Sequence, residues 1–293
     1  MHHRSRQLLV AGHVIVDRYL RVDAMPAADR TVPVTSERTE LGGTATNLAR
    51  TACKLGVRVG ILSRIGEGFP PEFRATLARE RIDLRGLTSV AGAPTPTCTI
   101  LEEPGGTTRT LIQQGPMVAT SRWPLPGPWW GSYEWLHLCT GDPGYYLRLA
   151  RAAHANHQRV SIDPAQEIFY RWDARAFRGI LPFADLLFGN RAEIERATSW
   201  VGPGGPTRLL ERIPLVIRTE GGRGATAFSR DGTVHVAGRK PRRVRSYVGA
   251  GDAFRGGFYA AWFAGESLEH CLTAGTRAAV RRIEGSTSRG SPT

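Results

Sequence analysis

Short apolar runs alternate along this chain with longer stretches in which apolar residues recur at helical spacing. The apolar runs have the length of buried strands and lie at residues 8–11, 59–63, 135–138, 160–163, 186–189, 215–219, 225–229 and 234–237. Helical spacing predicts helices at residues 47–55, 71–80, 145–154, 191–198 and 252–264. Repeated strand-then-helix units favour a mainly parallel sheet with helices on both faces. The pattern therefore predicts an α/β fold built on one central sheet.

Two segments interrupt this alternation. Residues 19–34 mix charged and apolar side chains with little period, and residues 97–112 hold two strand-like runs around Pro104-Gly105-Gly106. The second arrangement is typical of a β-hairpin. We expect both segments to form a small sheet, a lid beside the main sheet, within a single domain that spans residues 1–293.

The composition is ordinary for a globular protein. Hydrophobic residues make up 41% and charged residues 22% of the 293 residues, so the chain can bury a large core. No apolar run is long enough to span a bilayer, and the polar start of the chain does not resemble a signal peptide. We therefore expect a cytoplasmic protein with no membrane partner. The four cysteines are widely spaced and give no zinc pattern.

The formal net charge is +13, and all but two of the 39 lysines and arginines are arginines. The densest basic cluster, at residues 239–245, contains no aromatic side chain, and no nucleic-acid-binding motif occurs in the chain. Charge alone supports only nonspecific contact with nucleic acid. We therefore expect no specific nucleic-acid partner, and we interpret the basic surface as one that attracts phosphorylated ligands.

Residues 248–258, V-G-A-G-D-A-F-R-G-G-F, are the most informative stretch for chemistry. Gly249 and Gly251 allow a tight turn before a long apolar helix, whose N-terminus offers unpaired N–H donors and a positive dipole end. A phosphoryl group fits such a cradle, and we expect the N–H groups of Ala250, Gly251 and Asp252 to line it. Asp252 can also accept the proton of an attacking hydroxyl group. For the motif alone, a loop ending in an aspartate N-cap is the simpler interpretation.

The phosphate loop of P-loop enzymes and the protein-kinase motifs are both absent. The chain instead resembles the PfkB/ribokinase family of carbohydrate and nucleoside kinases. The family's two signatures match Gly249-Ala250-Gly251-Asp252 and, about 200 residues earlier, Gly42, Gly43 and Asn47. The resemblance covers nearly the whole chain and implies a ribokinase-like three-layer sandwich with a small β lid.

The resemblance also implies roles for individual residues. Asp17, in a G-x-x-x-x-D motif, would bind sugar hydroxyls beside Gly42, Gly43 and Asn47. In an N-x-x-E motif, Asn190 and Glu193 would help to arrange the phosphates and Mg²⁺, in the family usually through water. The implied phosphate donor is ATP, and the residues that match the family's nucleotide loop are Thr219, Gly221 and Gly224.

Three further residues are candidates for substrate contact. Asp163 and Gln166 follow a predicted parallel strand, at the end where α/β sheets bind ligands. Arg109 lies in the predicted hairpin and could reach a substrate phosphate, although a solvated arginine is the alternative. An exposed lid sheet could also pair between subunits, which leaves a homodimer open.

Residues 137–143 and 161–166 are similar to archaeal-type nucleoside kinases of broad specificity, so the predicted acceptor is the 5′-hydroxyl of a nucleoside. A sugar or sugar phosphate is the alternative acceptor, and a non-catalytic ligand-binding protein is the alternative class. Where the family commonly has Asp-Thr, this chain has Ser246-Tyr247. We therefore doubt a strong monovalent-cation site, and Arg245 could supply positive charge instead.

Overall fold

The computed structural model describes residues 6–104, 107–118, 120 and 122–285. Within these residues the largest element is a nine-stranded sheet with the order β13-β12-β11-β10-β9-β8-β1-β4-β5. Its strands are β1 (Arg6–Ala11), β4 (Val59–Glu67), β5 (Asp83–Pro94), β8 (Tyr133–Leu138), β9 (Arg159–Ile162), β10 (Leu186–Asn190), β11 (Leu215–Thr219), β12 (Gly224–Ser229) and β13 (Gly232–Ala237). In this sheet order, neighbouring strands pair parallel from β11 through β10, β9, β8, β1 and β4 to β5. Strands β12 and β13 add an antiparallel edge. The predicted, mainly parallel sheet is confirmed.

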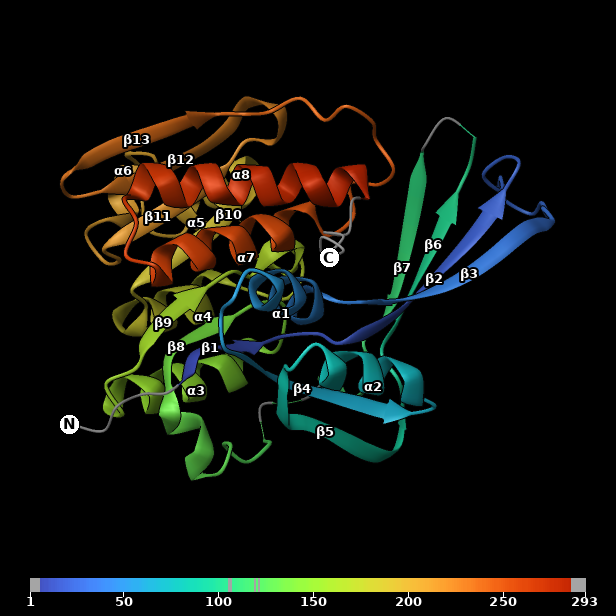
Figure 1. Ribbon diagram of the computed structural model, residues 1–293, viewed down its shortest axis with the longest axis horizontal. Helices are drawn as coiled ribbons and strands as arrows, with labels where there is room; N and C mark the ends of the chain where they lie inside the picture. Colours follow the sequence, from blue (N-terminus) through green and yellow to red (C-terminus); the bar gives the residue numbers. More distant parts are fainter. Residues whose placement is uncertain (1–5, 105–106, 119, 121, 286–293) are drawn as a thin grey trace, which may run out of the picture.

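Helices cover both faces of this sheet (Figure 1). One face packs against α1 (Thr44–Lys54), α2 (Pro71–Arg79), α7 (Ala250–Phe263) and α8 (Leu268–Glu284). The other packs against α3 (Pro143–Ala155), α4 (Ala174–Ile180), α5 (Arg191–Ser199) and α6 (Pro206–Leu209). None of the helices in the described part of the chain is both long and apolar enough to cross a membrane.

Strand β1 shows why the central strands read as continuous apolar runs. Leu8 and Val10 point into the core on the α1 and α7 side, whereas Leu9 and Ala11 point into the core on the α3 side. Successive side chains of a strand face opposite ways, and here both faces are covered. Every position of the strand centre must therefore be apolar.

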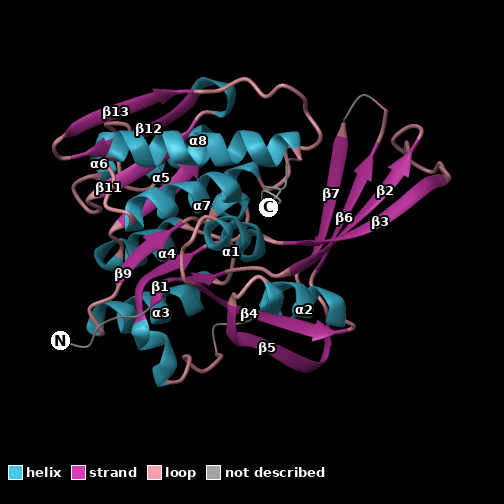
Figure 2. Cartoon of the chain, viewed as in Figure 1, coloured by secondary structure: helices cyan, strands magenta, loops and turns pink. Residues whose placement is uncertain are grey.

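A four-stranded sheet with the order β3-β2-β6-β7 projects from the main body (Figures 1 and 2). Its strands are β2 (Ile15–Val22), β3 (Val34–Gly42), β6 (Thr97–Glu102) and β7 (Thr108–Gln113). Strands β6 and β7 pair antiparallel, so the predicted hairpin is confirmed, although residues 105–106 lie outside the described residues.

The predicted boundaries of the first lid segment, residues 19–34, are wrong. That range cuts β2 in half and ends where β3 begins. In β2, Asp17 and Tyr19 are buried while Arg18 between them is exposed, because only one face of this sheet is well covered. The charges on the open face hide the strand in the hydrophobicity pattern.

Candidate active site

Two cavities lie on the two sides of the loop that leads into α7. The first has a volume of about 180 Å³ and brings together Asp17 of β2, Gly43 and Asn47 at the start of α1, and Asp252 of α7. The second has a volume of about 290 Å³ and is lined by part of α8 and by the predicted nucleotide-loop residues Thr219, Gly221 and Gly224. We call them the Asp252 cavity and the Thr219 cavity.

The loop itself is the wall between these cavities. Val248 and Gly249 line the Asp252 cavity, whereas Tyr247, Ala250 and Gly251 line the Thr219 cavity. Ligands in the two cavities would therefore meet at the start of α7. Both cavities lie at the carboxyl end of the parallel strands, where α/β sheets bind ligands.

The first turn of α7 offers a smaller cradle than the sequence suggests. Gly249 is the N-cap residue with φ of 77°, in the left-handed region that favours glycine. The N–H group of Ala250, predicted to line the cradle, donates instead to the carbonyl of Tyr247 at 3.1 Å. The N–H groups of Gly251 and Asp252 belong to the first turn, which has no intrahelical carbonyl partners, and they can bind an anion.

Asp252 faces the Asp252 cavity and is held by the side chain of Asn47. The Asn47 amide nitrogen donates to the Asp252 carboxylate at 3.1 Å. Burial raises the pKa of Asp252 to about 6, although Arg255 and the Asn47 hydrogen bond oppose the rise. A carboxylate with this pKa is ionised at neutral pH and is a stronger base than an ordinary aspartate.

Asp17 lies in the same cavity and is only 7% exposed. Burial, and then the nearby Glu40 on β3, raise the pKa of Asp17 to about 7. Gly42 is required beside it, because a Cβ at residue 42 would overlap the Asp17 carboxylate. The neighbouring Gly43 has φ of 99° and leads into α1, which carries Asn47.

The Thr219 cavity combines a glycine-rich turn with an apolar wall. The turn connects β11 and β12, and Gly224 has φ of 107° there. The apolar wall comes from α8, with Ala279, Val280 and Ile283. Backbone groups beside an apolar wall suit a planar heterocycle such as a purine base.

Asn190 and Glu193 form the N-terminal cap of α5. The Asn190 side chain accepts from the Glu193 N–H at 2.9 Å, and the Glu193 carboxylate accepts from the Asn190 N–H at 2.7 Å. Burial raises the pKa of Glu193, and Asp163 adds to the rise. Neither residue lines the two cavities.

Three predicted substrate contacts do not line the Asp252 cavity: Asp163, Gln166 and Arg109. Asp163 is buried and accepts from Arg255 Nη2 at 2.8 Å. Gln166 and Arg109 are exposed, the latter on β7 of the lid. The carboxylate of Asp163 is thus paired with the Arg255 guanidinium and does not face the Asp252 cavity.

That cation, Arg255, was not singled out from the sequence. It is 5% exposed, and a Cβ on Gly251 would lie 2.6 Å from Arg255 Nη1. The guanidinium therefore lies directly behind the loop that leads into α7. Arg245, proposed for this purpose from the sequence, is exposed and packs against Gly285. The buried positive charge therefore comes from α7 itself.

Further residues that are not among the predicted site residues line the Asp252 cavity, among them His13, Thr140, Glu167, Tyr170 and Ile112. His13 Nδ1 pairs with the Thr140 hydroxyl at 2.8 Å, and burial lowers the pKa of His13 to about 4, so it is neutral. Burial raises the pKa of Glu167 to about 7. Only the position of His13 beside Gly12 could have marked it in the sequence.

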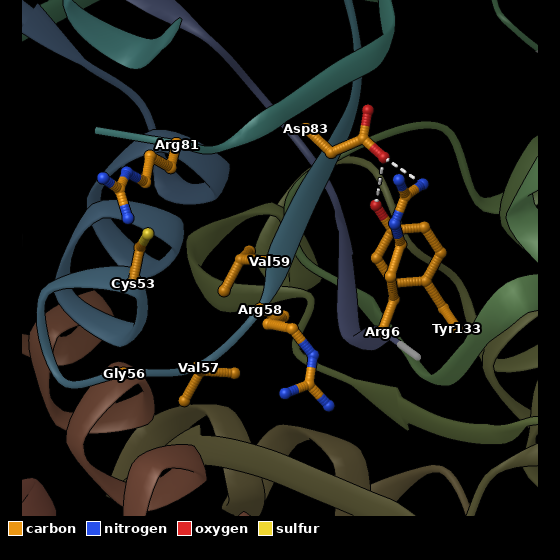
Figure 3. Close-up of a pocket in the computed structure, with 9 residues that line it drawn as sticks. All are labelled: Arg6, Cys53, Gly56, Val57, Arg58, Val59, Arg81, Asp83 and Tyr133. Atoms are coloured by element: carbon orange, nitrogen blue, oxygen red, sulfur yellow. Dashed lines mark hydrogen bonds and ion pairs between the residues drawn. The ribbon is translucent and has the colours of Figure 1, made fainter. Parts of the chain in front are cut away.

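A further hollow of about 520 Å³ lies at the opposite, amino end of the strands (Figure 3). Here the Asp83 carboxylate accepts from Arg6 at 2.6 Å and from the Tyr133 hydroxyl at 2.7 Å, and it pairs with Arg85. None of the predicted site residues lines this hollow.

The arrangement around α7 has the parts that phosphoryl transfer requires. A carboxylate base, a cradle for an anion and a second cavity for a nucleotide lie together at one loop. The fold and the site define a phosphotransferase that acts on an alcohol group. The chain belongs to the pfkB family of carbohydrate kinases, whose family model matches residues 5–292.

Individual relatives agree with this family. The chain is 29% identical to a nucleoside kinase of Methanothermobacter thermautotrophicus, over 91% of this chain and 86% of the relative. It is also 29% identical to an ATP-dependent ribose-1-phosphate kinase of Halopiger xanaduensis, over 91% and 88%. The crystal structure of the Methanocaldococcus jannaschii nucleoside kinase matches with a TM-score of 0.88 and 28% identity, over 95% of this chain and 92% of that one. The predicted ribokinase-like fold is confirmed.

Proposed function

We propose that this enzyme transfers the γ-phosphoryl group of ATP to the 5′-hydroxyl of a nucleoside. The observation that carries the proposal is that one loop, residues 247–251, separates two cavities. Asp252 lines the first cavity, and the turn between β11 and β12 lines the second. The similarity to archaeal nucleoside kinases supports a nucleoside as the acceptor.

The rim of the Asp252 cavity also suits a nucleobase. Tyr170, which follows a short 3₁₀ helix (Ala165–Phe169), is 62% exposed, and Ile112 of the lid is 45% exposed. An exposed aromatic ring and an aliphatic side chain give apolar surfaces on which a flat base can stack. The sugar would then lie deeper, beside Asp17 and Asn47.

The chemistry follows from this placement. Asp252 takes the proton of the acceptor hydroxyl while the oxygen attacks the γ-phosphorus in line, and the bond to the β,γ-bridging oxygen breaks. ADP leaves with the bridging oxygen and its charge. The N–H groups of Gly251 and Asp252 and the positive end of the α7 dipole stabilise charge on the phosphoryl oxygens.

The family resemblance implies Mg²⁺, and Glu193 fits a water-mediated contact with it. One Glu193 oxygen accepts from the Asn190 N–H, which leaves the other for a metal-bound water. Among the described residues no group of three His, Cys, Asp or Glu side chains could hold a metal. When bound to the triphosphate, Mg²⁺ would neutralise phosphate charge.

The lid is the proposed dimer contact. Its edge strands are β3 and β7, and Val34 and Leu111 are 49% and 65% exposed. Pairing two lids would cover these side chains and the strand edges. Sedimentation velocity should show a dimer that Leu111→Glu converts to a monomer; a monomeric wild type would contradict this contact.

A coupled ADP-release assay tests the acceptor. Purified enzyme is given ATP and Mg²⁺ with a panel of nucleosides, ribose, ribose 1-phosphate and a ketohexose, with mass spectrometry of each product. We expect turnover with nucleosides, a 5′-monophosphate product, and loss of turnover when EDTA removes Mg²⁺. Turnover confined to free sugars or to the sugar phosphate would show that the acceptor is a sugar and not a nucleoside. No turnover with any acceptor would contradict the proposal.

A further inference from the structure

Arg282 lies beside the loop that leads into α7, although about 33 residues of sequence separate Arg282 from Gly249 in that loop. It belongs to the last turn of α8, and its Nε lies 3.2 Å from the position that a Cβ on Gly249 would occupy. The side chain is half-buried. Its guanidinium is therefore close to the N-cap residue of α7, where the two cavities meet.

Small side chains between α7 and α8 bring Arg282 to this position. A Cβ on Gly257 would lie 2.7 Å from the Cβ of Ala278, and a Cβ on Gly275 would lie 2.8 Å from the ring of Phe254. The two helices are joined by a short connection at residues 264–267, so they run antiparallel. Close antiparallel packing sets the last turn of α8 against the first turn of α7.

The guanidinium of Arg282 makes no hydrogen bond or ion pair within the described part of the protein. The neighbouring Arg255 differs, since its guanidinium is paired with the Asp163 carboxylate. A half-buried guanidinium without an acceptor favours an anionic ligand.

The charge also reaches both carboxylates of the Asp252 cavity. Burial raises the pKa of Asp17 and of Asp252, and Arg282 is among the charges that oppose the rise in each. Arg282 thus lies near the proton-accepting carboxylate and near the sugar-binding carboxylate. The phosphoryl group passes between the two ligands in this part of the site.

We propose that Arg282 is a catalytic residue that donates hydrogen bonds to the oxygens of the phosphoryl group in transit. The inference rests on the proposed function for the identity of the acceptor. As the acceptor oxygen bonds to the γ-phosphorus and the bridging oxygen leaves with ADP, Asp252 holds the proton and Arg282 offsets charge on the equatorial oxygens.

A matched pair of variants separates this role from a structural one. Arg281 lies in the same last turn and is exposed, so Arg281→Gln removes the same charge from the same end of the helix dipole. Arg282→Gln should lower kcat by about 10²-fold with little change in the KM for a nucleoside, because a donor used only in the transition state is lost. Arg281→Gln should stay within about twofold of the wild type, and Arg282→Lys should recover part of kcat.

Two results would overturn the proposal. An equal loss in Arg281→Gln and Arg282→Gln would assign the effect to the helix end. A rise in KM for a phosphorylated acceptor, with kcat unchanged, would place Arg282 on the phosphate of the acceptor instead. Thermal midpoints of all three variants must match the wild type within about 2 °C, or Arg282→Lys replaces Arg282→Gln as the deciding variant.

A binding measurement distinguishes this proposal from the proposed function. ADP with Mg²⁺ and aluminium fluoride imitates a phosphoryl group in transit without any acceptor. Calorimetry should show that fluoroaluminate tightens ADP binding to the wild type and to Arg281→Gln, and much less to Arg282→Gln. This result can hold even if no nucleoside is phosphorylated, whereas equal tightening in all three proteins would contradict the role of Arg282.

Discussion

The hollows at the two ends of the parallel strands differ in how well their carboxylates are paired with hydrogen-bond donors and cations. At the amino end, Asp83 accepts hydrogen bonds from Arg6 and from the Tyr133 hydroxyl (Figure 3). It also pairs with Arg85. At the carboxyl end, Asp17 and Asp252 lie in a smaller cavity where burial raises both pKa values. A carboxylate with several donors, such as Asp83, has its hydrogen-bonding capacity used, whereas an underpaired carboxylate can take a proton or bind a hydroxyl group.

The comparison teaches that volume does not locate this active site. The amino-end hollow has about 520 Å³ against about 180 Å³ for the Asp252 cavity. The chemistry depends on which carboxylates lack cationic partners and face a cradle for phosphate. The following predictions test whether the two ends differ in this way.

The largest effect is expected for the base. Asp252→Asn should lower kcat by at least about 10²-fold, because the hydroxyl proton has no acceptor in the transition state. The ADP-release assay gives kcat, and circular dichroism confirms that the fold persists. Near-normal turnover would remove Asp252 as the base.

The pH profile should show the same group. Asp252 must be ionised to accept a proton, and burial raises its pKa to about 6. Below this pH, kcat measured at saturating acceptor should therefore fall about tenfold for each pH unit. A profile that stays level well below pH 6 would be inconsistent with a base of raised pKa.

The sugar contact should affect binding more than chemistry. Asp17→Asn should raise the KM for the acceptor by about tenfold or more, because hydrogen bonds to a charged carboxylate are weakened. The exposed Asp23, which follows β2, provides the control Asp23→Asn. If both variants bind the acceptor like the wild type, Asp17 does not hold the sugar.

At the other end of the sheet, the effect should fall on stability alone. Asp83→Asn weakens three interactions and should lower the free energy of unfolding by about 1–2 kcal/mol. Urea denaturation measures this change, and kcat should stay within about twofold. A large loss of kcat in the folded variant would show that the two ends are coupled.

The smallest effect is a gain in stability at the active site. Burial raises the folded-state pKa of Asp252 from 3.8 to about 6, so the stability that this group contributes is present below pH 3.8 and is lost as pH rises through 6. Asp252→Asn has no such loss, and its thermal midpoint should exceed that of the wild type by about 2–5 °C at pH 8. The difference should disappear near pH 4, and a lower midpoint at pH 8 would contradict it.

Much of the main domain could be predicted from the sequence, since buried parallel strands such as β1 and β10 give unbroken apolar runs. Strands β2 and β3 could not, because one face of the lid is open and carries charge. The pattern also did not single out α8, whose apolar positions are divided between α7 and the Thr219 cavity.

The sequence by itself predicted the candidate site at the head of α7, because a glycine turn, a helix start and Asp252 are adjacent in the chain and need no distant partner to be recognised. The tertiary structure alone decided which charges surround that carboxylate. Arg255 of α7 reaches Asp163, which follows β9, and Arg282 reaches Gly249 because α7 and α8 pack closely through glycine and alanine. Such contacts depend on distance in space, which a local pattern of residues does not encode.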